Sequence, residues 1–326
     1  MSVKKNAKSK HQLTYLEAFV ACLNTKLATE RAEWPTLRCW SMPSLQRLFR
    51  EIRGELTESG LRSKVSNKSL LQWLSSVNIA REVVTEGMSF HVLEIGTPLG
   101  NTPDPLELLM AARPKGVICY FSSVAFHSLT TQQVAHHHVA MLQKPTVNLT
   151  TNKTGDAITD AVADGTKSPS SQPPQLGQII FRYEGTPYYV TKRSSRLVPG
   201  VQLRAYGPRV NLRITTYEQT LIDTLYKPFH CGGPEVVFEA WQEARRASRL
   251  DEEWLADYFQ KMMYPATARR TAVMFKLNGY VPGEALRHVL DETREVINRE
   301  SEFALISLLP GVEYKNLDEE WLVHTP

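Results

Sequence analysis

The sequence predicts an α+β protein with two parts, a small helical domain at the N-terminus and a larger domain in which a sheet precedes a run of helices. Three observations predict this class. Apolar residues recur at helical spacing through residues 13–76, apolar and polar residues alternate after residue 179, and helical spacing returns after residue 216. A chain of 326 residues is long enough for each part to bury a core of its own.

Residues 1–96 are predicted to form three helices followed by a β-hairpin. Apolar side chains at helical spacing place the helices at about 14–27, 44–56 and 67–76. Strands at 79–85 and 89–95 flank Glu86-Gly87, a dipeptide typical of a two-residue hairpin turn. Three helices and a hairpin in this order predict a winged helix-turn-helix DNA-binding domain.

The third of these helices carries a polar and basic face opposite its leucines. Asparagine and glutamine pair with adenine, serine contacts bases or phosphates, and lysine neutralises phosphates. We therefore predict DNA contacts at this helix and at one arginine of the hairpin. The predicted residues are Lys64, Ser66, Asn67, Lys68, Ser69, Gln72 and, on the hairpin, Arg81. The alternatives are an ordinary solvated helix face and an edge-strand cation.

The second domain is predicted to span residues 97–326, after a turn-forming segment rich in proline and glycine at 97–105. The next segments are predicted as a helix, a buried strand, a second helix and a second strand, at 106–112, 116–121, 122–129 and 138–142. Residues from about 150 to 177 are small and polar, so they cannot bury enough apolar area to offset the entropy of ordering them. We expect a flexible insertion there.

Alternating residues between 179 and 214 predict three or four antiparallel strands. The stretch from Arg182 to Arg213 contains seven basic residues and one acidic residue, Glu184. A sheet surface so one-sided in charge suits an acidic partner, so we predict that its arginines bind a partner protein. They are Arg193, Arg196, Arg204, Arg209 and Arg213. DNA binding by these arginines is the alternative.

Helices are predicted from residue 217 to about residue 299, with a short terminal strand at 303–309. Thr216 and Gln219 have the spacing of a capping box, in which side chains and backbone satisfy each other at a helix start. Gly232-Gly233 breaks the chain, and Pro234 suits the first position of the next helix. Asp223 lies among apolar positions, so we expect a structural carboxylate bonded to backbone or to an arginine.

Apolar stripes on the next two predicted helices include Trp241 and Trp254. Such stripes are most simply core, and a partly exposed partner surface is the alternative.

No residue pattern in the chain predicts a catalytic or metal site. The run 136–138 holds three histidines, but neighbouring strand residues face opposite sides and cannot all reach one ion. Ser122 and Cys231 lie in no nucleophile motif, and no phosphate-binding glycine loop is present. We therefore expect a binding protein that is not an enzyme, with no metal and no cofactor.

Composition is typical of a soluble globular protein, with 42% hydrophobic and 22% charged residues and a net charge of +4. No apolar run approaches the ~20 residues that a membrane helix needs. The four cysteines, at 22, 39, 119 and 231, show no paired spacing, which favours a reducing compartment. We expect a cytoplasmic protein whose basic excess lies in the first 95 residues.

The stretch from Ile214 to Tyr280 resembles the AbiEi antitoxin family of bacterial toxin–antitoxin systems. It begins Ile-Thr-Thr-Tyr-Glu-Gln-Thr-Leu-Ile-Asp at residues 214–223, restarts a helix after Gly232-Gly233, and ends in Asn-Gly-Tyr at 278–280. Residues 122–130 are similar to the family's serine-alanine helix and leucine-threonine turn. Gln219 stands where the family usually has arginine, so no role of that arginine is carried over. The resemblance covers about residues 110–290.

The resemblance implies an antitoxin of a type IV toxin–antitoxin, or abortive infection, system that acts in phage defence. Its larger domain is expected to neutralise a nucleotidyltransferase toxin, and its winged domain to repress the shared operon at inverted repeats. A stand-alone transcriptional regulator without a toxin is the first alternative. An enzyme that acts on nucleic acid is the second, but the basic strands lack the clustered carboxylates such an enzyme needs.

Overall fold

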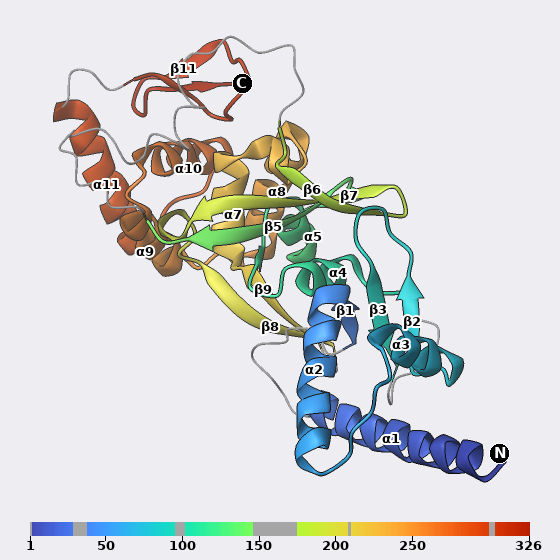
Figure 1. Cartoon of the computed structure of the whole chain (residues 1–326). Coiled ribbons are helices and arrows are strands. Elements are labelled where there is room, and N and C mark those ends of the chain that lie inside the picture. Colours follow the sequence, from blue (N-terminus) through green and yellow to red (C-terminus); the bar gives the residue numbers. More distant parts are fainter. Residues whose placement is uncertain (1, 29–37, 95–101, 146–174, 208–209, 300–303) are drawn as a thin grey trace, which may run out of the picture. The chain divides into compact units, whose positions relative to one another are not determined.

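The computed structural model describes residues 2–28, 38–94, 102–145, 175–207, 210–299 and 304–326, and is a mixed α+β protein (Figure 1). The chain divides into two compact units. The first is made of residues 1–115, 180–185 and 205–212, and the second of residues 116–179, 186–204 and 213–326. Nearly all of the predicted insertion at about 150–177 lies outside the described residues. None of the described helices is both long and apolar enough to span a membrane.

The first unit contains four helices and a small sheet within its described residues. The elements are α1 (Ser2–Ala28), β1 (Cys39–Ser41), α2 (Met42–Glu58), α3 (Asn67–Ser76), β2 (Ala80–Val83), β3 (Phe90–Leu93) and α4 (Pro105–Ala112). The three strands are antiparallel in the order β1-β3-β2, with Trp40 opposite His91 and Arg81 opposite Val92. The three predicted helices are therefore present, while β1 is a strand that the sequence did not predict.

The core of this unit is formed where the apolar faces of α1, α2 and α3 meet. Phe19 of α1 and Phe49 of α2 pack edge to face with ring centroids 5.3 Å apart. Leu70 and Leu74 of α3 are fully buried in the same cluster. Burial of the leucine face fixes which side of α3 remains in solvent.

The turn that joins β2 to β3 differs from the predicted two-residue turn. The strands end at Val83 and resume at Phe90, so residues 84–89 form a longer loop. Glu86 in this loop exchanges two backbone hydrogen bonds with Arg182, each 2.9 Å long. The ring of Phe90 packs against that of Phe181 at 4.9 Å. The loop is longer because its backbone pairs with a distant strand, a contact that local sequence does not reveal.

Helix α4, which the predicted boundary at residue 97 assigned to the larger domain, belongs to the first unit. Arg38 holds Glu107 of α4 through two hydrogen bonds of 3.1 and 2.6 Å. Asp104 caps the helix by accepting from the backbone N–H of Leu106 at 2.8 Å. The unit thus extends to residue 115 because a buried ion pair fastens α4 to the strand region at residue 38.

The central sheet has six strands and is mixed rather than antiparallel. Its strands and the short helices between them are β4 (Val117–Ile118), α5 (Phe121–Phe126), β5 (His137–Gln143), β6 (Gln178–Tyr183), β7 (Thr186–Ser194), η1 (Ser195–Leu197), β8 (Val201–Gly207) and β9 (Val210–Thr215). The strand order is β6-β7-β5-β4-β9-β8.

Two of the pairings in this sheet are parallel, β5 with β7 and β4 with β9, while β4 and β5 are antiparallel. The prediction of an antiparallel sheet is wrong because β4 and β5 lie between β7 and β9. The alternation of apolar and polar residues along a strand indicates which side is buried, but it does not indicate which strands are its neighbours in the sheet.

The rest of the second unit is helical and ends in a second small sheet. The elements are α7 (Tyr217–Tyr226), η2 (Pro228–Cys231), α8 (Pro234–Ala247), α9 (Glu252–Met262), α10 (Pro265–Leu277), α11 (Glu284–Arg299), β10 (Ile306–Ser307), β11 (Asn316–Asp318) and β12 (Val323–Thr325). The strand order is β10-β12-β11, so one predicted terminal strand becomes three. Buried Arg269 of α10 holds this sheet by donating to the carbonyls of Trp321 and Leu322, at 2.8 and 2.7 Å.

Candidate functional site

The predicted DNA-contacting face of α3 lies largely in solvent. Lys64, Lys68 and Gln72 are exposed. Ser66 is the N-cap of the helix, because its hydroxyl accepts from the backbone N–H of Ser69 at 3.1 Å and lies 2.9 Å from the Ser69 hydroxyl. These two serines therefore act first in capping, and the two lysines and the glutamine present the polar surface. The sixth predicted residue, Asn67, is half-buried in the first turn.

Arg81, predicted as a cation that contacts DNA from the hairpin, has a carboxylate partner. Its Nε donates to Oε1 of Glu94 at 3.2 Å, and the carboxylate is almost wholly buried. The DNA contact of Arg81 stays a prediction, and the charge of the arginine is balanced by this carboxylate. The pair forms because Arg81 of β2 lies opposite Val92 of β3, and Glu94 directly follows the end of β3, within reach of the arginine.

The five arginines predicted to bind a partner do not form one exposed surface. Arg204 on β8 is exposed, and its Nε donates to Oε1 of Gln202 at 2.8 Å. Arg196 on η1 and Arg213 on β9 are half-buried, and Arg209 lies outside the described residues. Arg193 is only 3% exposed, so its prediction as a partner-binding residue is wrong.

Arg193 and Asp223 form a buried two-pronged ion pair between β7 and α7. The two guanidinium nitrogens Nη1 and Nη2 donate to the two carboxylate oxygens, each at 2.7 Å. The guanidinium also lies over the ring of Tyr120, with Cζ 4.8 Å from the ring centroid. Burial acts to lower the pKa of Arg193, but the Asp223 carboxylate together with Tyr120 and Cys119 outweighs burial and the pKa is raised. The expectation that Asp223 bonds to an arginine is confirmed.

Gln219 joins this network instead of completing a capping box. The Thr216 hydroxyl accepts from the Gln219 backbone N–H at 3.2 Å, as the predicted box requires. The Gln219 side chain, however, donates to Asp223 at 2.9 Å and accepts from the backbone N–H of Gly200 at 3.2 Å. The amide also donates to the carbonyl of Leu197 at 3.2 Å, so the position needs two donors and one acceptor. Arginine has no acceptor, so glutamine suits this site better.

The three histidines of residues 136–138, at the start of β5, divide between two opposite sides, as strand geometry predicts. His136 and His138 share one face with His230, with ring centroids 4.8 Å apart for His136–His138 and 5.4 Å for His138–His230. Tyr189 stacks on His138 at 5.1 Å. Burial lowers the pKa of His136 and His138 and lowers that of His230 to about 3. The cluster is thus neutral and aromatic at physiological pH. The described residues contain no group of three or more ligands arranged to hold a metal ion.

The other face of β5 brings Ser122 within 3.2 Å of Nδ1 of His137. A serine beside a histidine is the usual beginning of a nucleophilic site. Here the serine is 2% exposed, and its hydroxyl already accepts the backbone N–H of His138 at 2.9 Å. Burial lowers the pKa of His137 to about 4 and raises that of the Cys231 thiol. These groups are placed for packing, because a substrate has no access to the serine.

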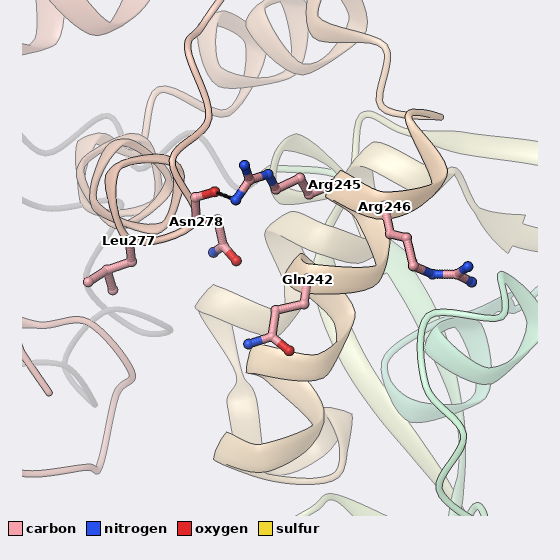
Figure 2. A pocket seen from close by; sticks show the side chains of 5 residues that line it. All are labelled: Gln242, Arg245, Arg246, Leu277 and Asn278. Atoms are coloured by element: carbon pink, nitrogen blue, oxygen red, sulfur yellow. Dashed lines mark hydrogen bonds between the residues drawn. The ribbon is translucent and has the colours of Figure 1, made fainter.

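A solvent-open pocket of about 480 Å³ lies where the end of α8 meets the end of α10 (Figure 2). It is lined by Gln242, Arg245, Arg246, Leu277 and Asn278. Arg245 reaches across the pocket and donates to the backbone carbonyl of Asn278, as Figure 2 shows. Arg246 points away from Asn278 and pairs with Glu243 through bonds of 2.7 and 2.8 Å.

The sequence prediction did not include this pocket, although part of its signal is visible in the sequence. Arg246 has an acidic residue three positions earlier, whereas Arg245 has Gln242 at that position and Trp241 at the fourth. An arginine in the last helical turn without a local carboxylate was identifiable. The meeting of α8 with residues 277–278 was not, because it depends on tertiary packing.

Comparisons with known proteins include a distant structural likeness. No family model matches the chain, and no curated protein matches it. Among solved structures, the crystal structure of the RV2827C protein from Mycobacterium tuberculosis matches at 10% sequence identity with a TM-score of 0.48, covering 95% of this chain and 90% of that one.

We predict that Asp223→Asn destabilises the protein by about 3–5 kcal/mol, because it leaves the buried Arg193 charge without a counter-ion. Urea unfolding followed by circular dichroism measures this. Lys261→Ala, which breaks the exposed Lys261–Asp257 pair, is the control and should change stability by less than about 0.5 kcal/mol. A loss below about 1 kcal/mol for Asp223→Asn would show that the ion pair does not hold β7 on α7.

We also predict that the free energy of unfolding falls as the pH is lowered from about 6.5 to 4. The pKa values of His127 and His137 are near 4 and that of His230 is near 3, all lowered by burial. The unfolded chain, with histidine pKa near 6.5, therefore takes up protons first as the pH falls. At pH 5 each such histidine should cost about 2 kcal/mol.

Urea unfolding at pH 7 and pH 5 tests this expectation, with His138→Phe as the matched variant that keeps an aromatic ring. The variant should lose less stability than the wild type over the same interval, because burial lowers the pKa of His138 well below its ordinary value and phenylalanine takes up no proton. Equal midpoints for the wild type at both pH values would contradict it.

Proposed function

We propose that the protein is a DNA-binding regulator whose second unit neutralises a nucleotidyltransferase toxin. The observation that carries the first half is the exposed polar and basic face of α3, held outward by its buried leucines. The order of three helices and a sheet within the first unit supports a winged helix-turn-helix. The resemblance of residues 214–280 to AbiEi antitoxins supports the second half.

In this proposal α3 enters the major groove. Lys64 and Lys68 neutralise phosphates and set the position of the helix, while Asn67 and Gln72 are the residues with bidentate amides able to read adenine. Ser66 contributes by capping, since its hydroxyl already bonds to Ser69. The face therefore divides into positioning cations and base-reading amides.

The hairpin has a smaller part in DNA binding than a free wing would have. Glu86 is paired through its backbone with Arg182, and Arg81 is paired with Glu94. The backbone of this loop is already hydrogen-bonded at Glu86, so that part of it is not free to contact DNA. We therefore assign base reading to α3 rather than to the hairpin.

For toxin neutralisation, the supporting observation is the cationic edge of the central sheet. Arg204 on β8 and Arg213 on β9 lie on neighbouring strands, and Arg204 is exposed. A nucleotidyltransferase gathers carboxylates and nucleotide phosphates at its cleft, so a cationic surface complements it and speeds encounter. Arg193 has no direct part in this surface because it is buried.

A stand-alone transcriptional regulator is the second candidate, and the exposed face of α3 favours it equally. The two differ in what the second unit does. Co-expression with a nucleotidyltransferase toxin, scored by growth, separates them: an antitoxin restores growth and a stand-alone regulator does not.

We predict that Lys68→Ala weakens binding to all DNA sequences and lowers the salt dependence by about one counter-ion, because a phosphate contact carries no base information. Gln72→Ala should instead cost about 1–3 kcal/mol at the preferred site and little on random DNA. Fluorescence anisotropy over a salt series measures both, with Lys315→Ala, an exposed cation of the second unit, as the control. Wild-type affinity in both α3 variants would remove this helix as the reader.

We predict that Arg204→Glu abolishes growth rescue in the co-expression assay. The reversed charge repels the acidic partner, while the exposed side chain contributes little to folding. Circular dichroism should be unchanged, and Lys315→Glu should rescue growth as the wild type does. Full rescue by Arg204→Glu would place the toxin-binding surface elsewhere on the second unit.

A further inference from the structure

The α8–α10 pocket contains an arginine that is fixed in place and has no carboxylate partner. Nη1 of Arg245 is bonded to the carbonyl of Asn278. The guanidinium also lies over Gly279, where a Cβ would sit 3.6 Å from Nη1 and 3.7 Å from Nη2. Gly279 has a φ of +60°, a conformation that favours glycine and brings the turn beneath the arginine. These contacts hold the guanidinium against the turn at Asn278 and Gly279.

The cationic side chains near Arg245 are paired with carboxylates, while Arg245 itself is not. Arg246 is neutralised by Glu243, and Lys276 at the end of α10 is paired with Asp318. Within the described part of the chain, no carboxylate lies within 4.0 Å of the Arg245 guanidinium. A cation near a helix C-terminus gains from the helix dipole, which explains its presence in the last turn of α8. The dipole does not explain why its remaining N–H groups face an open pocket.

The other walls of the pocket combine an amide with exposed apolar surface. Gln242, one turn before Arg245, is exposed (Figure 2). Leu277 is 51% exposed. Exposed apolar side chains beside an ordered arginine are typical of the centre of a protein–protein contact. The volume of about 480 Å³ holds one or two side chains.

We propose that this pocket binds an acidic segment of a partner protein, with one carboxylate on Arg245 and an adjacent apolar side chain on Leu277. A carboxylate accepts the N–H groups that Asn278 leaves free on Arg245, and the Gln242 amide donates a further bond. Charge complementarity selects an acidic occupant, and the apolar rim selects a peptide over a small anion. The identity of the partner as the toxin rests on the proposed function, while binding of the acidic segment does not.

Titration of the ¹⁵N-labelled full chain with the peptide acetyl-Leu-Glu-Asp-Leu-amide tests the pocket directly. The side-chain signals of Arg245 Nε–H and Gln242 should shift, and the peptide acetyl-Leu-Gln-Asn-Leu-amide should bind at least tenfold more weakly. Gln242→Glu places a carboxylate beside Arg245 that competes with the acidic segment, so it should abolish the shift of the Arg245 signal. Arg245→Glu should abolish the shift of the Gln242 signal. The Lys315→Glu variant should bind the acidic peptide as the wild type does.

Equal binding of the two peptides, or no binding of the acidic one, overturns the proposal. Equal shifts with inorganic phosphate show a general anion site and also overturn it.

Growth rescue distinguishes failure of this inference from failure of the proposed function. If the wild type restores growth and Gln242→Glu does not, the pocket is the toxin contact. If both restore growth, the pocket is not the toxin contact although the antitoxin function stands. If the wild type itself fails to restore growth, the antitoxin function is wrong and the peptide titration alone decides whether the pocket binds acidic segments.

Discussion

The buried ion pair between Arg193 and Asp223 is the interaction on which the second unit depends. It joins β7 of the central sheet to α7, and it places a guanidinium over Tyr120 at the turn between β4 and α5. A buried charge is tolerated only when a counter-charge and hydrogen bonds replace its water. Gln219 supplies a further bond to the same carboxylate. Removing any one of these partners therefore leaves a buried polar or charged group without its hydrogen bond, which lowers the free energy of unfolding.

The same ion pair changes how the charge of the chain is interpreted. Seven basic residues between 182 and 213 suggest a cationic surface when only neighbours in the sequence are considered. Asp223 lies 30 residues beyond Arg193, so the compensation is invisible to local reasoning. Arg204 is exposed to solvent, while Arg81 pairs with the carboxylate of Glu94. Positive charge available to a ligand is thus concentrated at fewer residues than composition indicates, among them Lys64, Lys68 and Arg204.

Sequence reasoning succeeded where structure is decided locally. The bounds of α3 follow from the leucine spacing, and Gly232 and Pro234 mark the restart at α8. It failed where partners are distant. The mixed order of the central sheet depends on β4 and β5 lying between strands that follow them in sequence. Strand β1 was not predicted because its three residues are too few to show an alternating pattern. The pocket at Arg245 was not predicted because it forms only where the ends of two helices meet.

The proposed function assigns its two activities to two separate surfaces, α3 for DNA and the second unit for a toxin. Because residues 180–185 and 205–212 belong to the first unit, truncation at residue 95 would damage both, and point variants are the cleaner tool.

The most direct measurement scores reporter repression and growth rescue in the same cells for a Lys68→Ala/Gln72→Ala variant and for Arg204→Glu. We expect reciprocal losses: the α3 variant loses repression and keeps rescue, and Arg204→Glu loses rescue and keeps repression. Loss of both activities in both variants, with folding intact, would contradict two separate surfaces.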